Sequence, residues 1–239
     1  MRILVINPNS SLEMTQSIRD SLDGVCRTDT SLDVVRLDAA PPAIESATDV
    51  AMSVPHLLDK VRWADQEGYD SVILACFSDP GLEAARETTD RLVLGIEQTT
   101  LAVAAMLGHK YTILTPRPSR IPSKEQDVRR FRQDAACASV RALDLSVEQT
   151  EADPSLTKQR VIEVARRAIE EDGAEVIILG CAGMVGYAEE LEKTLGIIVL
   201  DPTTVTLKVA EALNEIGIHH SKHALYAFPP VRREEGGSA

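Results

Sequence analysis

Long apolar runs are absent from this 239-residue sequence. No run approaches the roughly 20 apolar residues that a membrane-spanning helix requires. The N-terminal run at residues 1–6 is too short for the apolar part of a signal peptide, and Asn7-Pro8-Asn9 interrupts it. We therefore expect residues 3–6 to form the first β-strand, and we expect a cytoplasmic protein.

Cysteine is scarce, and its spacing does not suggest a metal site. The four cysteines, at positions 26, 76, 137 and 181, form no C-x-x-C pair, and a cytoplasmic chain of this length does not depend on disulfides. No G-x-G-x-x-G motif follows a predicted strand, and no His-Glu-x-x-His frame occurs. The sequence therefore predicts neither a metal site nor a bound cofactor.

Basic residues are fewer than acidic residues in this sequence. The chain has 25 Lys and Arg against 37 Asp and Glu, which gives a net charge of −12 at pH 7. An acidic surface repels nucleic-acid phosphates and anionic membranes. We therefore expect no nucleic-acid partner and no membrane partner, and the charge says little more.

Two short apolar runs, each ending in a cysteine, are the most informative feature of the chain. One lies in residues 71–80 and ends at Cys76, and the other lies in residues 174–183 and ends at Cys181. Such runs are typical of fully buried parallel strands. Open α/β sheets bind ligands at the carboxyl ends of their strands, so we expect both thiols to face one site.

The two runs belong to an internal duplication. A shift of 105 residues moves Cys76 onto Cys181, and a shift of 108 moves residues 6–8 onto residues 114–116. Strands alternate with helical segments throughout, which indicates parallel sheets with right-handed crossovers. We predict an α/β fold of two pseudo-symmetric domains, each a four-stranded parallel sheet flanked by helices, with the active site in the cleft between them. The alternative is a single eight-stranded doubly wound sheet.

The predicted elements divide between two lobes. Residues 1–98 with 206–239 are expected to form the first lobe, and residues 99–205 the second. One helix is expected to begin with a capping box at Ser10, and another to be capped by Asp79. The strands are predicted at residues 3–6, 32–37, 72–75, 92–96, 111–114, 139–143, 176–180 and 197–200.

Two thiols across a cleft suit the transfer of a proton from one face of a carbon to the other. One thiolate would remove the proton, and the opposite thiol would deliver one. A thiol has a reference pKa of about 8.5, and a helix beginning after each cysteine would favour the thiolate. Either cysteine alone could equally be a small core residue, but their equivalent positions favour chemistry.

Six segments of the sequence together resemble one protein family. They are residues 3–11 (ILVINPNSS), 42–45 (PAIE), 75–82 (ACFSDPGL), 137–141 (CASVR), 179–184 (LGCAGM) and the 221–230 tail. In this order, over nearly the whole chain, they resemble the aspartate/glutamate racemase superfamily and, within it, the hydantoin and allantoin racemases. The resemblance implies racemisation without a cofactor, Cys76 and Cys181 as the acid–base pair, and a homo-oligomer.

The resemblance also implies residues that bind the substrate. Asn7 and Ser78 would offer polar side chains, although each has an alternative role in the turn that contains it. Backbone N–H groups would act after the second cysteine, and the loop at residues 41–46 would contact the substituent of the substrate. The expected substrate-binding residues are Asn7, Ile44, Phe77, Ser78, Ala182 and Gly183.

A neutral cyclic ureide fits these motifs better than a dicarboxylate. Neither cysteine motif contains an arginine or lysine that could pair with a carboxylate. A 5-substituted hydantoin carries a C5 proton acidified by the ring carbonyl, and allantoin is the same ring with a ureido substituent. Glu97 departs from the small residue that the resemblance leads us to expect, and we predict that it reshapes the pocket or repels an acidic substrate.

Three other functions compete with racemisation of a ureide. A maleate-type isomerase and an arylmalonate-type decarboxylase belong to the same superfamily, and a non-catalytic small-molecule binding protein is the third. The decarboxylase requires only one thiol, and binding alone requires none. The pair of cysteines therefore favours the racemase.

Overall fold

The computed structural model describes residues 1–230 and contains two parallel sheets. The strands of the first sheet are β1 (Arg2–Asn7), β2 (Ser31–Arg36), β3 (Ser71–Leu74) and β4 (Leu92–Gly95). Those of the second are β5 (Tyr111–Thr115), β6 (Cys137–Ala142), β7 (Val176–Leu179) and β8 (Ile198–Leu200). The strand orders, β2-β1-β3-β4 and β6-β5-β7-β8, are equivalent, and all pairs are parallel. The prediction of two four-stranded sheets is confirmed, and the alternative single sheet is wrong.

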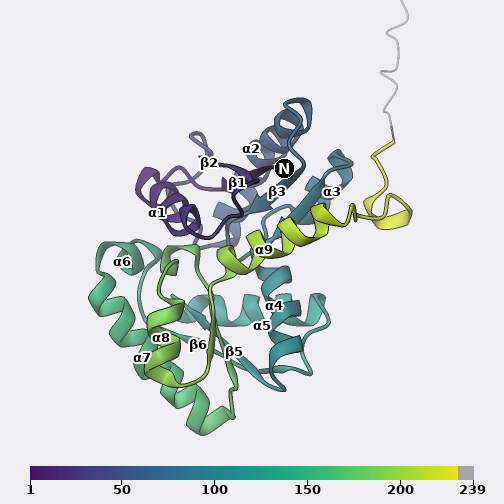
Figure 1. The fold of residues 1–239 in the computed structure, drawn as a ribbon. Helices are drawn as coiled ribbons and strands as arrows, with labels where there is room; N and C mark the ends of the chain where they lie inside the picture. Colours follow the sequence, from purple (N-terminus) through teal and green to yellow (C-terminus); the bar gives the residue numbers. More distant parts are fainter. Residues whose placement is uncertain (231–239) are drawn as a thin grey trace, which may run out of the picture.

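Helices flank both sheets, and each sheet with its helices forms one of two lobes (Figure 1). The α-helices are α1 (Leu12–Asp23), α2 (Ala47–Gln66), α3 (Leu82–Thr88), α4 (Ile96–Leu107), α5 (Ile121–Arg130), α6 (Val147–Ala152), α7 (Pro154–Asp172), α8 (Ala188–Leu195) and α9 (Pro202–Glu215). Three short 3₁₀ helices are η1 (Pro118–Arg120), η2 (Ala182–Met184) and η3 (Ala224–Tyr226). Among residues 1–230, no helix combines the length and the apolar character that crossing a membrane requires.

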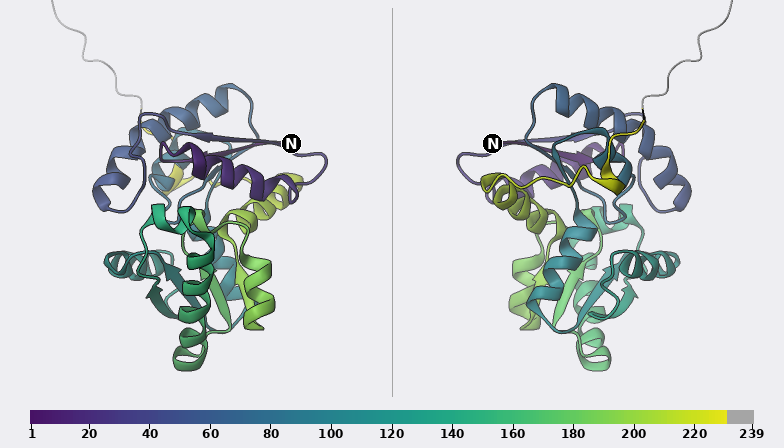
Figure 2. Two further views of the ribbon diagram at one scale, coloured as in Figure 1. Left: turned by 90° about the vertical axis from the view of Figure 1, so that its left-hand side faces the viewer. Right: turned by 90° about the vertical axis from the view of Figure 1, so that its right-hand side faces the viewer.

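The two lobes, which Figure 2 shows stacked on each other, share one apolar core. The central strands β3 and β7 are buried along their whole length, as strands covered on both faces must be. One cluster of buried side chains joins Ile73 of the first sheet to Ile178 of the second, with Leu207 of α9 in the same cluster. Because this core spans both lobes, it fixes how the carboxyl ends of the two sheets face each other.

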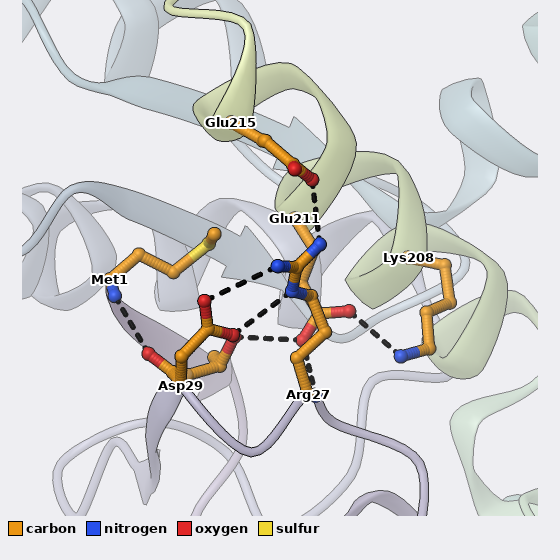
Figure 3. Close-up of polar contacts among 7 residues, drawn as sticks. Met1, Arg27, Asp29, Lys208, Glu211 and Glu215 are labelled. Carbon is orange, nitrogen blue, oxygen red and sulfur yellow. Dashed lines mark hydrogen bonds and ion pairs between the residues drawn. The ribbon is translucent and has the colours of Figure 1, made fainter.

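Helix α9 follows the last strand of the second sheet and binds to the first lobe. Arg27, in the loop between α1 and β2, donates from its guanidinium to Glu215 at 2.6 Å and from its backbone N–H to Glu211 at 2.8 Å (Figure 3). Lys208 donates to the nearly buried Glu211 at 2.8 Å. These contacts hold α9 across the boundary between the lobes, where it also packs on α4, β3 and β4.

The lobe boundaries after residues 98 and 205 stay a prediction. The chain passes from the first sheet to the second through α4, which contacts β4, β7 and α9 and therefore touches both lobes. Residues 231–239, which were assigned to the first lobe, lie outside the described residues.

Helix α1 begins one position later than predicted. Ser11, not Ser10, is its N-cap, and the Ser11 hydroxyl accepts the N–H of Met14 at 3.1 Å. Asn9 accepts the Ser11 N–H at 2.9 Å, which fixes the turn after β1. The Ser10 N–H donates instead to the carbonyl of Pro41 at 3.0 Å, so this turn also holds the loop that precedes α2.

Candidate active site

A cavity opens between the carboxyl ends of the two sheets. Cys76 lines it from the end of β3, and Cys181 lines it from the end of β7. The space is about 540 Å³ when its mouth, which is open to solvent, is included. The structure thus brings the two predicted thiols to one site. The other predicted site residues that line it are Ile44, Phe77, Ser78 and Ala182.

Two predicted site residues do not line the cavity. Asn7 is fully buried and donates its amide to Asn9 at 2.8 Å and to Thr15 at 3.0 Å, so it holds the turn after β1. Asn9, two residues later, lines the cavity instead. Gly183 is buried, and its N–H donates to the Cys181 sulfur at 3.3 Å.

A tight turn presents the Cys76 thiol. The Cys76 carbonyl accepts the N–H groups of Ser78 at 2.8 Å and Asp79 at 3.0 Å. Asp79 adopts a left-handed conformation with φ of 42°, which is unfavourable for a residue with a side chain. Its buried carboxylate accepts the N–H groups of Glu97 at 3.0 Å and Gln98 at 2.8 Å, and these bonds offset the strain.

Asp79 therefore caps a different helix from the one predicted. It caps α4, whereas α3 begins at Leu82 after Gly81, which has φ of 65° and no side-chain cap. The Asp79 carboxylate reaches α4 because Gly95 has no side chain, and a Cβ there would lie 2.2 Å from the carboxyl carbon of Asp79. Sequence adjacency to Pro80 suggested the wrong helix, because the chain turns sharply before α3.

Glycine also permits close packing beneath the second thiol. A Cβ on Gly180 would lie 2.6 Å from the backbone oxygen of Leu114, so β7 approaches β5 closely just before Cys181. Cys181 is buried and forms the N-cap of η2, where its sulfur accepts the N–H of Gly183. An N–H aimed at sulfur stabilises negative charge there.

Burial raises the pKa of the Cys76 thiol to about 12. The positive charge of Lys124 opposes this shift, and the neighbouring Cys181 adds to it, so the two thiols are close enough to interact electrostatically. The expectation that a helix N-terminus favours the Cys76 thiolate is wrong, because α3 begins only at Leu82. In the free protein near pH 7, Cys76 therefore holds its proton.

A buried ion pair supports the Cys76 loop. Lys124 of α5 lines the cavity, and its ammonium donates to the Phe77 carbonyl at 2.6 Å and to both oxygens of Glu97 at 2.8 and 2.7 Å. Asp127 accepts from the same ammonium at 2.9 Å. Lys124 is 2% exposed and Glu97 is fully buried. Glu97 does not line the cavity, so the expectation that it reshapes the pocket directly is wrong.

This network changes the ionisation of its members. Burial alone would lower the pKa of Lys124, but the charges of Glu97 and Asp127 outweigh it and raise that pKa. Burial raises the pKa of Glu97, and the positive charge of Lys124 opposes that shift. Lys124 is therefore a fixed positive charge beside the Cys76 loop.

Three cations at the cavity were missed by the sequence analysis. Arg117, Arg120 and Lys124 line the cavity, and all follow β5 rather than either cysteine. The duplication held a signal for their position, because the shift of 108 residues moves Asn9 onto Arg117, and both line the cavity. The cavity therefore contains cationic side chains, although neither cysteine motif contains an arginine or lysine.

Glu45 links the two lobes at the edge of the cavity. It belongs to the loop before α2 and accepts from the Arg117 guanidinium at 2.9 Å and from the Val147 N–H at 2.7 Å. Burial alone would raise the pKa of Glu45, but these two hydrogen bonds hold that pKa below its usual range. Glu45 therefore stays ionised and joins the first lobe to two segments of the second.

The site can be compared with known proteins. The model of the Asp/Glu/Hydantoin racemase family matches residues 3–210. The chain belongs to this family. The hydantoin racemase of Rhizobium meliloti is 37% identical over 236 residues, which cover 99% of this chain and 98% of that protein.

Solved structures of other family members have the same fold. The allantoin racemase from Klebsiella pneumoniae superposes with a TM-score of 0.92 at 35% identity, covering 96% of this chain and 94% of that chain. The allantoin racemase from Pseudomonas fluorescens superposes with a TM-score of 0.93 at 31% identity, covering 98% of this chain and 99% of that chain. These likenesses identify the protein as an isomerase of the racemase class, and the non-catalytic interpretation is wrong.

Proposed function

We propose that this racemase inverts C5 of 5-substituted hydantoins or allantoin by proton transfer between Cys76 and Cys181, without a cofactor. The observation that carries the proposal is that two thiols line one cavity from equivalent strand ends. The similarity to hydantoin and allantoin racemases supports the cyclic ureide as substrate.

C5 loses a proton on one face of the ring and gains a different proton on the other, in two steps. A thiolate on one side takes the C5 proton, and the electron pair of the broken C–H bond moves onto the adjacent carbonyl oxygen as an enolate. The thiol on the other side then gives its proton to C5. In the direction where Cys181 is the base, the protonated Cys76 is already the donor. The reverse direction exchanges these roles.

Donors beside the thiols would hold the enolate. Ser78 and Ala182 each follow a cysteine closely and line the cavity. A hydroxyl and a backbone N–H at these positions are suited to receive negative charge as it develops. Asn9 offers a third polar group in the lining.

Dicarboxylate substrates fit the cavity less well. A maleate-type isomerase or a malonate-type decarboxylase must bind two carboxylates, which calls for at least two available cations. In the cavity lining, Arg117 is paired with Glu45, and Lys124 is paired with Glu97 and Asp127. One thiol would also be unused in a decarboxylase.

The direct test is the decay of optical activity of single enantiomers. An L-5-alkylhydantoin and one enantiomer of allantoin are incubated with the protein, with no metal or cofactor added, and with enzyme-free buffer as control. We expect the circular-dichroism signal of at least one of these two rings to decay to zero faster than in buffer. Folded protein that accelerates decay of neither ring would refute the ureide substrate.

Replacing Glu45 with alanine is expected to raise KM by up to about fivefold with little change in kcat, because it removes a contact that closes the cavity rather than a reacting group. The melting temperature should hardly change, since the Glu45 and Arg117 side chains are 28% and 44% exposed. Steady-state kinetics and thermal unfolding test this expectation.

The matched control for Glu45 is Glu189→Gln, which removes an exposed ion pair with Lys193 in α8. The control should leave KM unchanged. An unchanged KM in Glu45→Ala as well would show that the contact between the lobes does not matter for binding.

A further inference from the structure

The cavity wall is positive although the chain is strongly acidic. The net charge of the protein is −12, yet Arg117, Arg120 and Lys124 all line the cavity, against a single lining carboxylate, that of Glu45. Three cations gathered at one small site in such a chain call for negative partners. The partners that the structure describes account for two of the three.

Arg120 is the cation left over. Arg117 pairs with Glu45 at 2.9 Å, and Lys124 is held by Glu97 and by Asp127. The Arg120 guanidinium, by contrast, makes no hydrogen bond or ion pair with any side chain or carbonyl described within residues 1–230. An unpaired guanidinium in a cavity wall is available to a ligand.

Arg120 is placed to contact the 5-substituent of the substrate rather than the reacting carbon, C5. Arg120 ends η1 and precedes α5, in the second lobe. A hydrogen bond from Ser46 holds the pKa of Asp49, at the start of α2 in the first lobe, below its usual range, and the charge of Arg120 adds to this effect. Arg120 and Ile44, of the loop before α2, line the same cavity. No ion pair joins Arg120 to Asp49 within residues 1–230, and one oxygen of Asp49 accepts from Glu45 and Ser46 at 2.7–3.1 Å in the cap of α2.

We propose that Arg120 selects hydantoins whose 5-substituent ends in a carboxylate, so that the preferred substrates are 5-(carboxyalkyl)hydantoins. This inference rests on the proposed function. Ile44 and Arg120 both line the cavity and are both partly exposed, so we place the substituent against them when C5 lies between Cys76 and Cys181. A guanidinium binds a carboxylate through two parallel N–H donors, a geometry that an amide or an alkyl group cannot match.

The test compares two substrates of nearly equal shape and different charge. They are 5-(2-carboxyethyl)hydantoin and 5-(2-carbamoylethyl)hydantoin, which differ by a carboxylate against an amide. In the wild type we expect kcat/KM to favour the carboxylate by about tenfold or more, the scale of a hydrogen bond to a charged group. In Arg120→Gln the ratio should fall to about one, and Arg120→Lys should retain part of the preference because it keeps the charge but loses the fork.

The control is Arg166→Gln, which removes an equal charge from an exposed position on α7 that does not line the cavity. It should keep the wild-type ratio, which separates a local contact from the loss of net positive charge. Thermal unfolding of each variant checks that the ratio is measured on folded protein.

The outcomes separate this inference from the proposed function. If both hydantoins are racemised by the wild type without preference for the carboxylate, or if Arg120→Gln keeps the preference, the role of Arg120 is refuted and the racemase remains. If the wild type racemises neither of these hydantoins nor the 5-alkylhydantoin and allantoin, the ureide function fails, and the inference fails with it.

Discussion

Cys76→Ser and Cys181→Ser are each expected to reduce racemisation by about a thousandfold or more. A hydroxyl is a far weaker acid than a thiol, so a serine can neither take nor return the C5 proton near pH 7, and acid–base catalysis contributes factors of about 10²–10⁴. Polarimetry on single enantiomers measures the loss. Cys26→Ser is the matched control, because Cys26 lies at the end of α1 and does not line the cavity.

Deuterium exchange should show which face each thiol serves. In D₂O, a variant that keeps one thiol can still exchange the proton of the enantiomer whose C–H bond points toward that thiol. We expect Cys76→Ser and Cys181→Ser to retain exchange with opposite enantiomers, measured by NMR. Exchange of the same enantiomer by both variants, or full racemisation by either, would contradict a mechanism with two bases.

Lys124→Met is expected to destabilise the fold by about 3–5 kcal/mol, the cost of leaving one partner of a buried ion pair alone. The Glu97 carboxyl, fully buried, would lose the ammonium that lies 2.7 Å from it, and the Phe77 carbonyl would lose its donor. Urea unfolding measures the effect. The double variant Lys124→Met/Glu97→Leu should recover much of the stability, since it leaves no fully buried charge unpaired, and Asp127, the other partner of Lys124, is 20% exposed.

The control for this pair is Lys193→Met, which breaks the exposed ion pair with Glu189 and should leave the urea midpoint unchanged. A Lys124→Met protein as stable as the wild type would show that Glu97 is satisfied in another way.

Loss of Lys124 should also move the pH dependence of activity. The thiolate is the charged form of Cys76, and the positive charge of Lys124 lowers a pKa that burial has raised to about 12. Removing that charge raises the pKa further. The rising limb of kcat/KM against pH should therefore shift to higher pH, for the enantiomer from which Cys76 takes the proton. The double variant with Glu97→Leu makes this measurement possible on stable protein, and an unshifted profile would exclude an electrostatic role for Lys124.

The sequence by itself determined the order of elements and the equivalence of the two halves. Both follow from local features: apolar runs long enough for a buried strand, turns after them, and the same order repeated after 105–108 residues. Parallel α/β sheets bind ligands at the carboxyl ends of their strands, and each cysteine follows such an end in one of two equivalent halves. Cys76 and Cys181 could therefore be assigned to one cavity before the fold was known. The homo-oligomer and the cellular compartment stay predictions.

Only the tertiary structure decided the electrostatics of the site. Asp79 finds its backbone donors 18 and 19 residues later, and Glu97 finds its lysine 27 residues later, from elements that the sequence does not show to be neighbours. That Arg117 is paired with Glu45, whereas Arg120 is unpaired within residues 1–230, depends on how each side chain lies relative to the loop before α2. Periodicity and turn chemistry act over a few residues and predict elements. The partner of a charged side chain depends on distances across the folded chain, and those distances exist only once both lobes have packed on their shared core.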